Sequence, residues 1–72
     1  MDEQTFLAQV AEIFDEDPAA MTMSTNLQAL AKWDSLTFMA LAVMLKTEFG
    51  QQVELHRLFV SKTPQDLWAL VH

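Results

Sequence analysis

Cysteine is absent from this chain, glycine occurs only once and proline only twice. Without cysteine the protein has neither a disulfide nor a thiolate-bound zinc ion, so packed helices must hold its 72 residues together. Hydrophobic residues make up 51% of the chain, which suffices for one small core. Because so little glycine and proline leaves no linker-like stretch, and no internal repeat is present, we expect one domain spanning residues 1–72.

Basic residues are also scarce: four lysines and arginines stand against ten acidic residues, giving a formal net charge of −6. Such a protein lacks the positive charge with which nucleic-acid-binding proteins contact phosphates, and an anionic membrane surface repels it likewise. An acidic surface favours association with basic patches on other proteins, mainly through the rate of encounter. We therefore expect protein partners and no binding of nucleic acid.

A long hydrophobic run is missing too. The longest apolar run covers eight residues, 38–45, whereas a transmembrane helix needs about 20. The first residues, Asp2 and Glu3 among them, are acidic where a secretion signal is basic. These features predict a cytoplasmic protein without a membrane span.

The apolar residues near the start follow the spacing of an amphipathic helix over residues 3–14. Pro18 and the three carboxylates before it end this helix, and we interpret that acidic trio as a solvated helix end because no calcium-loop spacing follows. Residues 15–33 lack clear periodicity. We expect them to form a long connection that packs across the bundle, with Thr25 capping one short helical turn.

The second helix has the clearest boundaries. Asp34 is a favoured N-cap, Ser35 is then the first helical residue, and Gly50 is the residue preferred just past a helix C-terminus. A short helix is expected around residues 54–60, and a last helix begins at Pro64 behind a threonine N-cap. The predicted fold class is therefore all-α: a small four-helix bundle with a short third helix and a long loop between the first two helices.

Ser35 is the best candidate for the functional atom of the chain. At the first turn of a helix, its hydroxyl lies where free backbone N–H groups and the positive end of the helix dipole favour a phosphate or another anion.

The second helix has two apolar stripes, where a surface helix usually has one. The stripe predicted to face the core contains Phe38, Leu41, Ala42, Leu45 and Phe49. The outer stripe, almost opposite, contains Leu36, Met39, Ala40 and Val43. An exposed apolar stripe marks a contact surface, and methionine there adapts to partners of different shape. We expect a monomer that docks partners through the outer stripe; the alternatives are that the long loop covers it or that two copies bury it in a dimer.

This constellation resembles the acyl carrier protein family. The resemblance extends over residues 6–71 and rests on the helix pattern, on Asp34-Ser35-Leu36 at the start of the second helix, and on Phe49-Gly50, Val53 and Thr63 at family spacing. It implies that Ser35 carries covalent 4′-phosphopantetheine, whose thiol holds acyl or aminoacyl groups as thioesters. It further implies that Asp34 caps the helix and that Leu36 is the first contact for partner enzymes.

The resemblance also implies that the protein has no catalytic residue and serves other enzymes. These are a phosphopantetheinyl transferase, a ligase or acyltransferase that loads the acyl or aminoacyl group, and condensing or tailoring enzymes downstream. The expected partner-binding residues are Asp34, Leu36, Met39 and Val43.

The outer positions of the second helix depart from the family pattern. Carriers of fatty-acid synthesis line this helix with acidic residues that meet basic patches on their enzymes. The corresponding positions here are Thr37, Ala40, Lys46 and Thr47, and only Glu48 is acidic. This predicts a discrete carrier in a specialised biosynthetic pathway, recognised mainly through apolar contacts.

Two aromatic residues near the motif also depart from it. Trp33 stands close to where the family often has glycine, and we expect it to be a partly buried anchor for the long loop. Phe38 lies on the predicted inner face, where a small residue would leave room for an acyl chain. We therefore hypothesise that long acyl chains are not held inside the bundle.

Two other functions are less favoured. A serine hydrolase would need a base and an oxyanion hole beside Ser35, but no Gly-x-Ser-x-Gly turn surrounds it, and the only histidines, His56 and His72, are interpreted as solvated. A carrier-shaped module that is never modified and binds partners through the outer stripe alone stays open. Arg57 could orient a partner or the cofactor phosphate, although a solvated charge is the simpler expectation.

Overall fold

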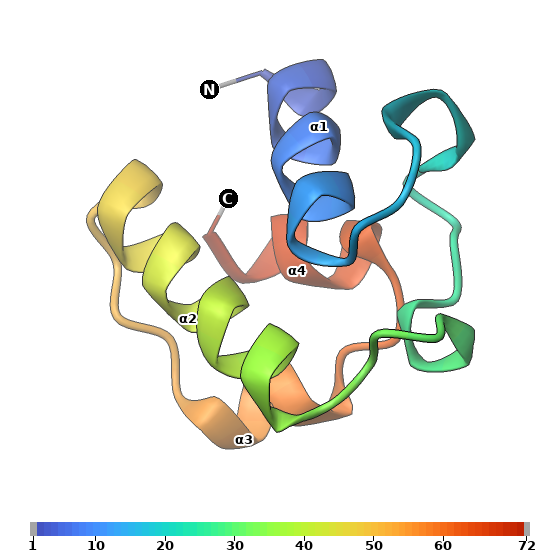
Figure 1. The fold of residues 1–72 in the computed structure, drawn as a ribbon. Coiled ribbons are helices and arrows are strands. Elements are labelled where there is room, and N and C mark those ends of the chain that lie inside the picture. The colour runs from blue at the N-terminus through green and yellow to red at the C-terminus, as the bar shows by residue number, and fades with distance from the viewer. Residues whose placement is uncertain (1, 72) are drawn as a thin grey trace.

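A computed structural model describes residues 2–71, and the regular secondary structure of this part of the chain is entirely helical (Figure 1). The four α-helices are α1 (Glu3–Ile13), α2 (Ser35–Phe49), α3 (Leu55–Val60) and α4 (Pro64–Val71). Two short 3-10 turns, η1 (Pro18–Ala20) and η2 (Leu27–Ala29), lie in the loop between α1 and α2. The predicted fold class, a small all-α bundle, is confirmed.

Thr63 and Gly50 cap helix ends as predicted, and Asp2 is a further cap that was not predicted. The Asp2 carboxylate accepts a hydrogen bond of 2.8 Å from the Thr5 N–H at the start of α1, and this bond holds the pKa of Asp2 below its ordinary value. At the start of α4, the Asp66 N–H donates to the Thr63 hydroxyl at 3.2 Å and the Asp66 carboxylate accepts from the Thr63 N–H at 3.3 Å. Gly50 ends α2 in the left-handed conformation (φ 67°), which glycine adopts without strain.

The hydrophobic core lies where all four helices meet. Its buried members are Phe6, Val10, Ala11, Phe14, Met21, Leu27, Leu41, Met44, Leu45, Leu58, Leu67 and Val71. Met44 belonged to neither predicted stripe of the second helix, yet it is buried against this core. Truncating one buried leucine or methionine to alanine typically costs about 2–5 kcal/mol, so these few side chains dominate the stability of a chain without disulfides.

The long loop is anchored against the segment that enters α4, not over α2. Met21 and Leu27 are buried, the Leu27 N–H donates to the Lys62 carbonyl at 2.8 Å, and the Gln65 N–H donates to the Met23 carbonyl at 3.0 Å. Figure 1 shows the turns of this loop on the opposite side of the molecule from α2.

The short turns in the loop have caps that differ from the prediction. Thr25 does not cap the second turn: Asn26 does, by accepting from the Gln28 N–H at 3.1 Å, because the turn begins one residue later than expected. The Thr25 hydroxyl instead accepts from the Thr22 N–H at 2.9 Å.

The acidic trio after α1 is partly structural. The Asp17 carboxylate accepts from the Ala19 N–H at 2.9 Å and so caps η1, whereas Asp15 adopts a left-handed conformation (φ 57°) that stops α1. Among residues 2–71 no cluster of carboxylates and histidines has the arrangement of a metal site.

Two aromatic clusters lie at the two ends of α2, and together they contain all five phenylalanines and both tryptophans. The cluster at the end of α2 joins Phe6, Phe49 and Trp68, with ring centroids 5.0–6.1 Å apart. The cluster at the start of α2 forms a chain of four rings: Phe14, Trp33, Phe38 and Phe59. Periodicity had assigned some of these residues to the core, but it did not indicate this grouping.

Candidate functional site

The start of α2 is fixed by a capping box between Asp34 and Thr37. The Asp34 carboxylate oxygen Oδ1 accepts from the Leu36 N–H at 2.9 Å and from the Thr37 N–H at 3.0 Å. In return, the Asp34 N–H donates to the Thr37 hydroxyl at 3.0 Å. The Thr37 hydroxyl also lies 3.0 Å from the Lys32 carbonyl, to which it can donate. This network holds the turn before α2 and the first turn of α2 as one unit.

Thr37 is therefore not an outer residue, and its placement among the outer positions of the second helix was wrong. Only 9% of its surface is exposed, because its hydroxyl points back into the capping box. The sequence contained the signal, since an N-cap aspartate followed three residues later by a residue that can bond back is a capping-box pattern.

Ser35 lies at the first position of α2, and its side chain is exposed. Its hydroxyl has no hydrogen-bond partner among residues 2–71. One part of the sequence expectation is corrected, however. Two of the N–H groups that were to attract an anion, those of Leu36 and Thr37, are already bonded to the Asp34 carboxylate. Ser35 therefore offers an accessible hydroxyl more than a ready pocket for a phosphate.

The outer stripe of α2 is exposed in the described structure. The exposed fractions are 78% for Leu36, 51% for Met39 and 63% for Val43, whereas Ala40 is half-buried. The alternative in which the long loop covers this stripe is wrong, because the loop is anchored beside α4.

Helix α3 adds apolar surface that the sequence reading did not predict. Leu58 is buried, but Leu55, Phe59 and Val60 are exposed. A helix of 6 residues is too short to bury them all, so the apolar surface continues from α2 onto α3.

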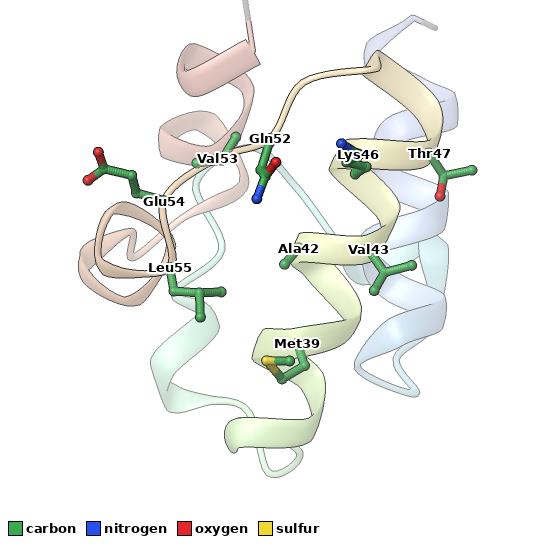
Figure 2. Close-up of a pocket in the computed structure, with 9 residues that line it drawn as sticks. All are labelled: Met39, Ala42, Val43, Lys46, Thr47, Gln52, Val53, Glu54 and Leu55. Carbon is green, nitrogen blue, oxygen red and sulfur yellow. The ribbon is translucent and has the colours of Figure 1, made fainter.

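A groove of about 680 Å³ separates α2 from the segment that leads into α3. Figure 2 shows its two walls, α2 on one side and residues 52–55 on the other. Its apolar lining residues are Met39, Ala42, Val43, Val53 and Leu55. Lys46 and Glu54, one on each wall, carry its charges. Met39 and Val43 belong to both the outer stripe and the groove, so the exposed apolar surface of α2 extends into a concave site.

A smaller pocket of about 290 Å³ lies directly beside Ser35. Its lining residues are Trp33, Asp34, Ser35, Phe38 and Phe59. Trp33 is half-buried, as expected of a loop anchor, and stacks on Phe14 with the ring planes 3° apart. Phe38 is half-buried and not fully inside, because its ring lies edge-on between Trp33 and Phe59.

The remaining candidates lie elsewhere. His56 is exposed on α3 and does not line the pocket at Ser35, and His72 lies outside the described residues. Arg57 lines a separate pocket with Gln51 and Leu70, so it is not placed to orient a group attached to Ser35. None of the helices between residues 2 and 71 has the length and apolar character needed to cross a membrane.

Comparison with known families assigns this fold and site to a class. The family model described as the phosphopantetheine attachment site matches residues 4–71, nearly the whole chain. The chain therefore belongs to the phosphopantetheine-binding family of acyl carrier protein type, whose domain is the site of covalent 4′-phosphopantetheine attachment. Domains of this family are generally non-catalytic carriers that interact with enzymes. Comparison with curated proteins and with solved structures gives no match.

Proposed function

We propose that Ser35 carries the 4′-phosphopantetheine and that the protein tethers acyl or aminoacyl intermediates as thioesters for the enzymes of a biosynthetic pathway. The observation that supports this is the geometry of Ser35: its hydroxyl is exposed, has no hydrogen-bond partner within residues 2–71, and lies on a first helical turn that is held by a capping box. The thioester chemistry is supplied by the thiol of the arm, and the protein supplies the attachment point and the surface that partners recognise.

Attachment requires a hydroxyl that another enzyme can reach. The Ser35 oxygen forms a bond to the phosphorus next to the pantetheine of coenzyme A, while the bond from that phosphorus to adenosine bisphosphate breaks. The hydroxyl proton passes to a base of the transferase. Asp34 is committed to the backbone through its hydrogen bonds, so its role is to hold Ser35 in place and not to act as that base.

The partner-binding surface in this proposal consists of Leu36, Met39 and Val43, with Asp34 at its edge and the groove of Figure 2 along its side. Apolar residues that are already exposed can bind a partner without unfolding anything. The adaptable Met39 side chain suits a surface that must meet several enzymes in turn.

The distribution of charge supports a specialised carrier. Six of the ten acidic residues lie within residues 2–17, whereas all four basic residues lie within residues 32–62 together with only three acids. The half of the chain that contains Ser35 is therefore close to neutral. We infer that clients recognise it through apolar contact and not through the basic patches that acid-lined carriers attract.

Incubation with coenzyme A and a broad-specificity phosphopantetheinyl transferase tests the assignment. Intact mass should rise by one phosphopantetheine group in the wild type and not in Ser35→Ala. If folded wild-type protein gains no mass with several transferases, the alternative of an unmodified interaction module replaces the carrier.

A further inference from the structure

The pocket beside Ser35 is apolar, although it lies at a helix terminus. Three of its five lining residues are aromatic: Trp33, Phe38 and Phe59. Phe59 leaves 60% of its surface exposed. Trp33 and Phe38 are half-buried and line the same pocket. Leaving this aromatic surface beside Ser35 in contact with water costs free energy, which an apolar ligand would recover by covering it.

The rings are held in place before anything binds. Phe38 lies edge-on to Trp33, with centroids 6.2 Å apart and planes at 77°, and Phe59 lies edge-on to Phe38 at 5.6 Å and 84°. Trp33 is stacked on the buried Phe14 at 6.0 Å. Each ring therefore fixes the next, and a ligand would not have to order them.

Few hydrogen-bond donors or positive charges near Ser35 are available to bind a phosphate attached to it. The N–H groups of Leu36 and Thr37 are bonded to Asp34, whose carboxylate places negative charge beside Ser35. Arg57 lines another pocket. A group attached at Ser35 can therefore gain most of its contact with the protein from the aromatic rings.

The arm begins with a phosphate, followed by a methylene and a carbon that bears two methyl groups. This dimethyl carbon is the compact apolar part nearest to the serine, whereas the cargo is attached at the far end beyond two amide groups. The chemistry of the pocket matches the dimethyl carbon, and its position next to Ser35 matches the point of attachment.

We propose that Trp33, Phe38 and Phe59 form a seat for the dimethyl segment of the phosphopantetheine arm, so that the arm lies against α2 and α3 between transfers. The proposal rests on the attachment of the arm to Ser35 and adds to it the place where the arm lies. A client enzyme must then draw the arm out of this seat.

Nuclear Overhauser contacts provide the direct test. Isotope-labelled protein is loaded from unlabelled coenzyme A, loading is verified by intact mass, and filtered spectra record contacts from the arm to the protein. Contacts from both arm methyl groups to ring protons of Trp33 and Phe59 are expected. Fully loaded protein whose arm methyls show no such contacts would overturn the seat and leave the carrier function standing. Failure of loading would overturn both.

Two neighbouring substitutions on α3 provide matched variants. Phe59→Ala removes a ring of the seat, whereas Val60→Ala removes a side chain of similar exposure, 56% against 60%, that does not line the pocket. Both residues are exposed, so both variants keep the core intact. The contacts from the arm methyl groups to Trp33 should disappear in Phe59→Ala and persist in Val60→Ala, with complete loading of both. Equal contacts in the two variants contradict the proposal.

Tryptophan fluorescence gives a second readout. In a Trp68→Phe variant Trp33 is the only tryptophan, and loading should shift its emission and protect it from a soluble quencher. In a Trp33→Phe variant, Trp68 reports from the other aromatic cluster and should not respond. An unchanged Trp33 signal in fully loaded protein argues against the seat.

Discussion

Asp34 and Thr37 bond to each other in both directions: the Thr37 N–H donates to the Asp34 carboxylate at 3.0 Å, and the Asp34 N–H donates to the Thr37 hydroxyl at 3.0 Å. Ser35 lies between these two residues and takes part in neither bond. The reciprocal pair therefore fixes the backbone on both sides of Ser35 while its hydroxyl stays accessible. This arrangement suits an attachment point, which needs a fixed backbone and a hydroxyl that is able to react.

Loss of the Thr37 hydroxyl should destabilise the protein. Thr37→Val keeps the shape of the side chain but removes the acceptor for the Asp34 N–H and the donor to the Lys32 carbonyl. We expect the free energy of unfolding to fall by about 1–2 kcal/mol in urea denaturation, the range for lost caps and buried hydrogen bonds. Thr47→Val, on the exposed part of the same helix, is the control and should change it by less than about 0.5 kcal/mol. Equal effects of the two would show that the capping box contributes little.

The outer stripe is tested by charge. Met39→Glu places a carboxylate in the middle of the proposed docking surface, at a position that is exposed and so tolerates it in the folded protein. We expect kcat/KM for modification by a phosphopantetheinyl transferase to fall by about tenfold or more, equivalent to about 1.4 kcal/mol. Ala8→Glu, an exposed position on α1, makes the same change of charge elsewhere and should leave kcat/KM unchanged. Unchanged modification of a folded Met39→Glu protein would remove this surface from the docking site.

Salt should have little effect on the same reaction. The Ser35 half of the chain is nearly neutral, so screening its charges removes little attraction. We expect KM with the transferase to vary by less than about threefold, or about 0.7 kcal/mol, as salt is raised. A Lys46→Glu, Thr47→Glu double variant restores an acidic helix and should become salt-sensitive with a transferase that presents a basic surface. A wild-type KM that rises steeply with salt would show that charge dominates recognition.

An octanoyl chain should stay out of the core. Phe38 is held between Trp33 and Phe59, and Leu41 and Leu45 are fully buried, so an acyl chain could enter the core only by displacing these side chains. NMR shift changes between the octanoyl-loaded and unloaded holo forms should therefore leave the buried Leu41 and Leu45 unaffected. In Phe38→Ala, where space is created, the changes should extend to the methyl groups of Leu41. Changes spread through the core of the wild-type protein would refute the exclusion.

The boundaries of the fold were predictable because they depend on local chemistry. Asp34 and Gly50 at the ends of α2, and Pro64 at the start of α4, act on the backbone within a few residues, so the sequence determines their effect. The exposed Leu36 and Val43 were predictable as well, since two opposite apolar stripes cannot both face a small core.

The features that could not be predicted depend on contacts between residues far apart in the sequence. The anchoring of the long loop rests on bonds such as that from Leu27 to Lys62, which no local pattern encodes. The aromatic pocket needs Phe59 of α3 beside Phe38 of α2, and periodicity could not tell that Phe59 would lie outside the core. The occupation of the N–H groups at the start of α2 could have been predicted, because an aspartate that caps a helix does so by accepting hydrogen bonds from them.

The most direct test of the account is where the phosphopantetheine group attaches. After reaction with coenzyme A and a phosphopantetheinyl transferase, intact mass and peptide fragmentation are recorded for the wild type, Ser35→Ala and Ser24→Ala, the last being a second exposed serine that serves as control. We expect one added group on the wild type and on Ser24→Ala, located at Ser35, and none on Ser35→Ala. Modification of Ser35→Ala, or a group located at any other residue, would contradict it.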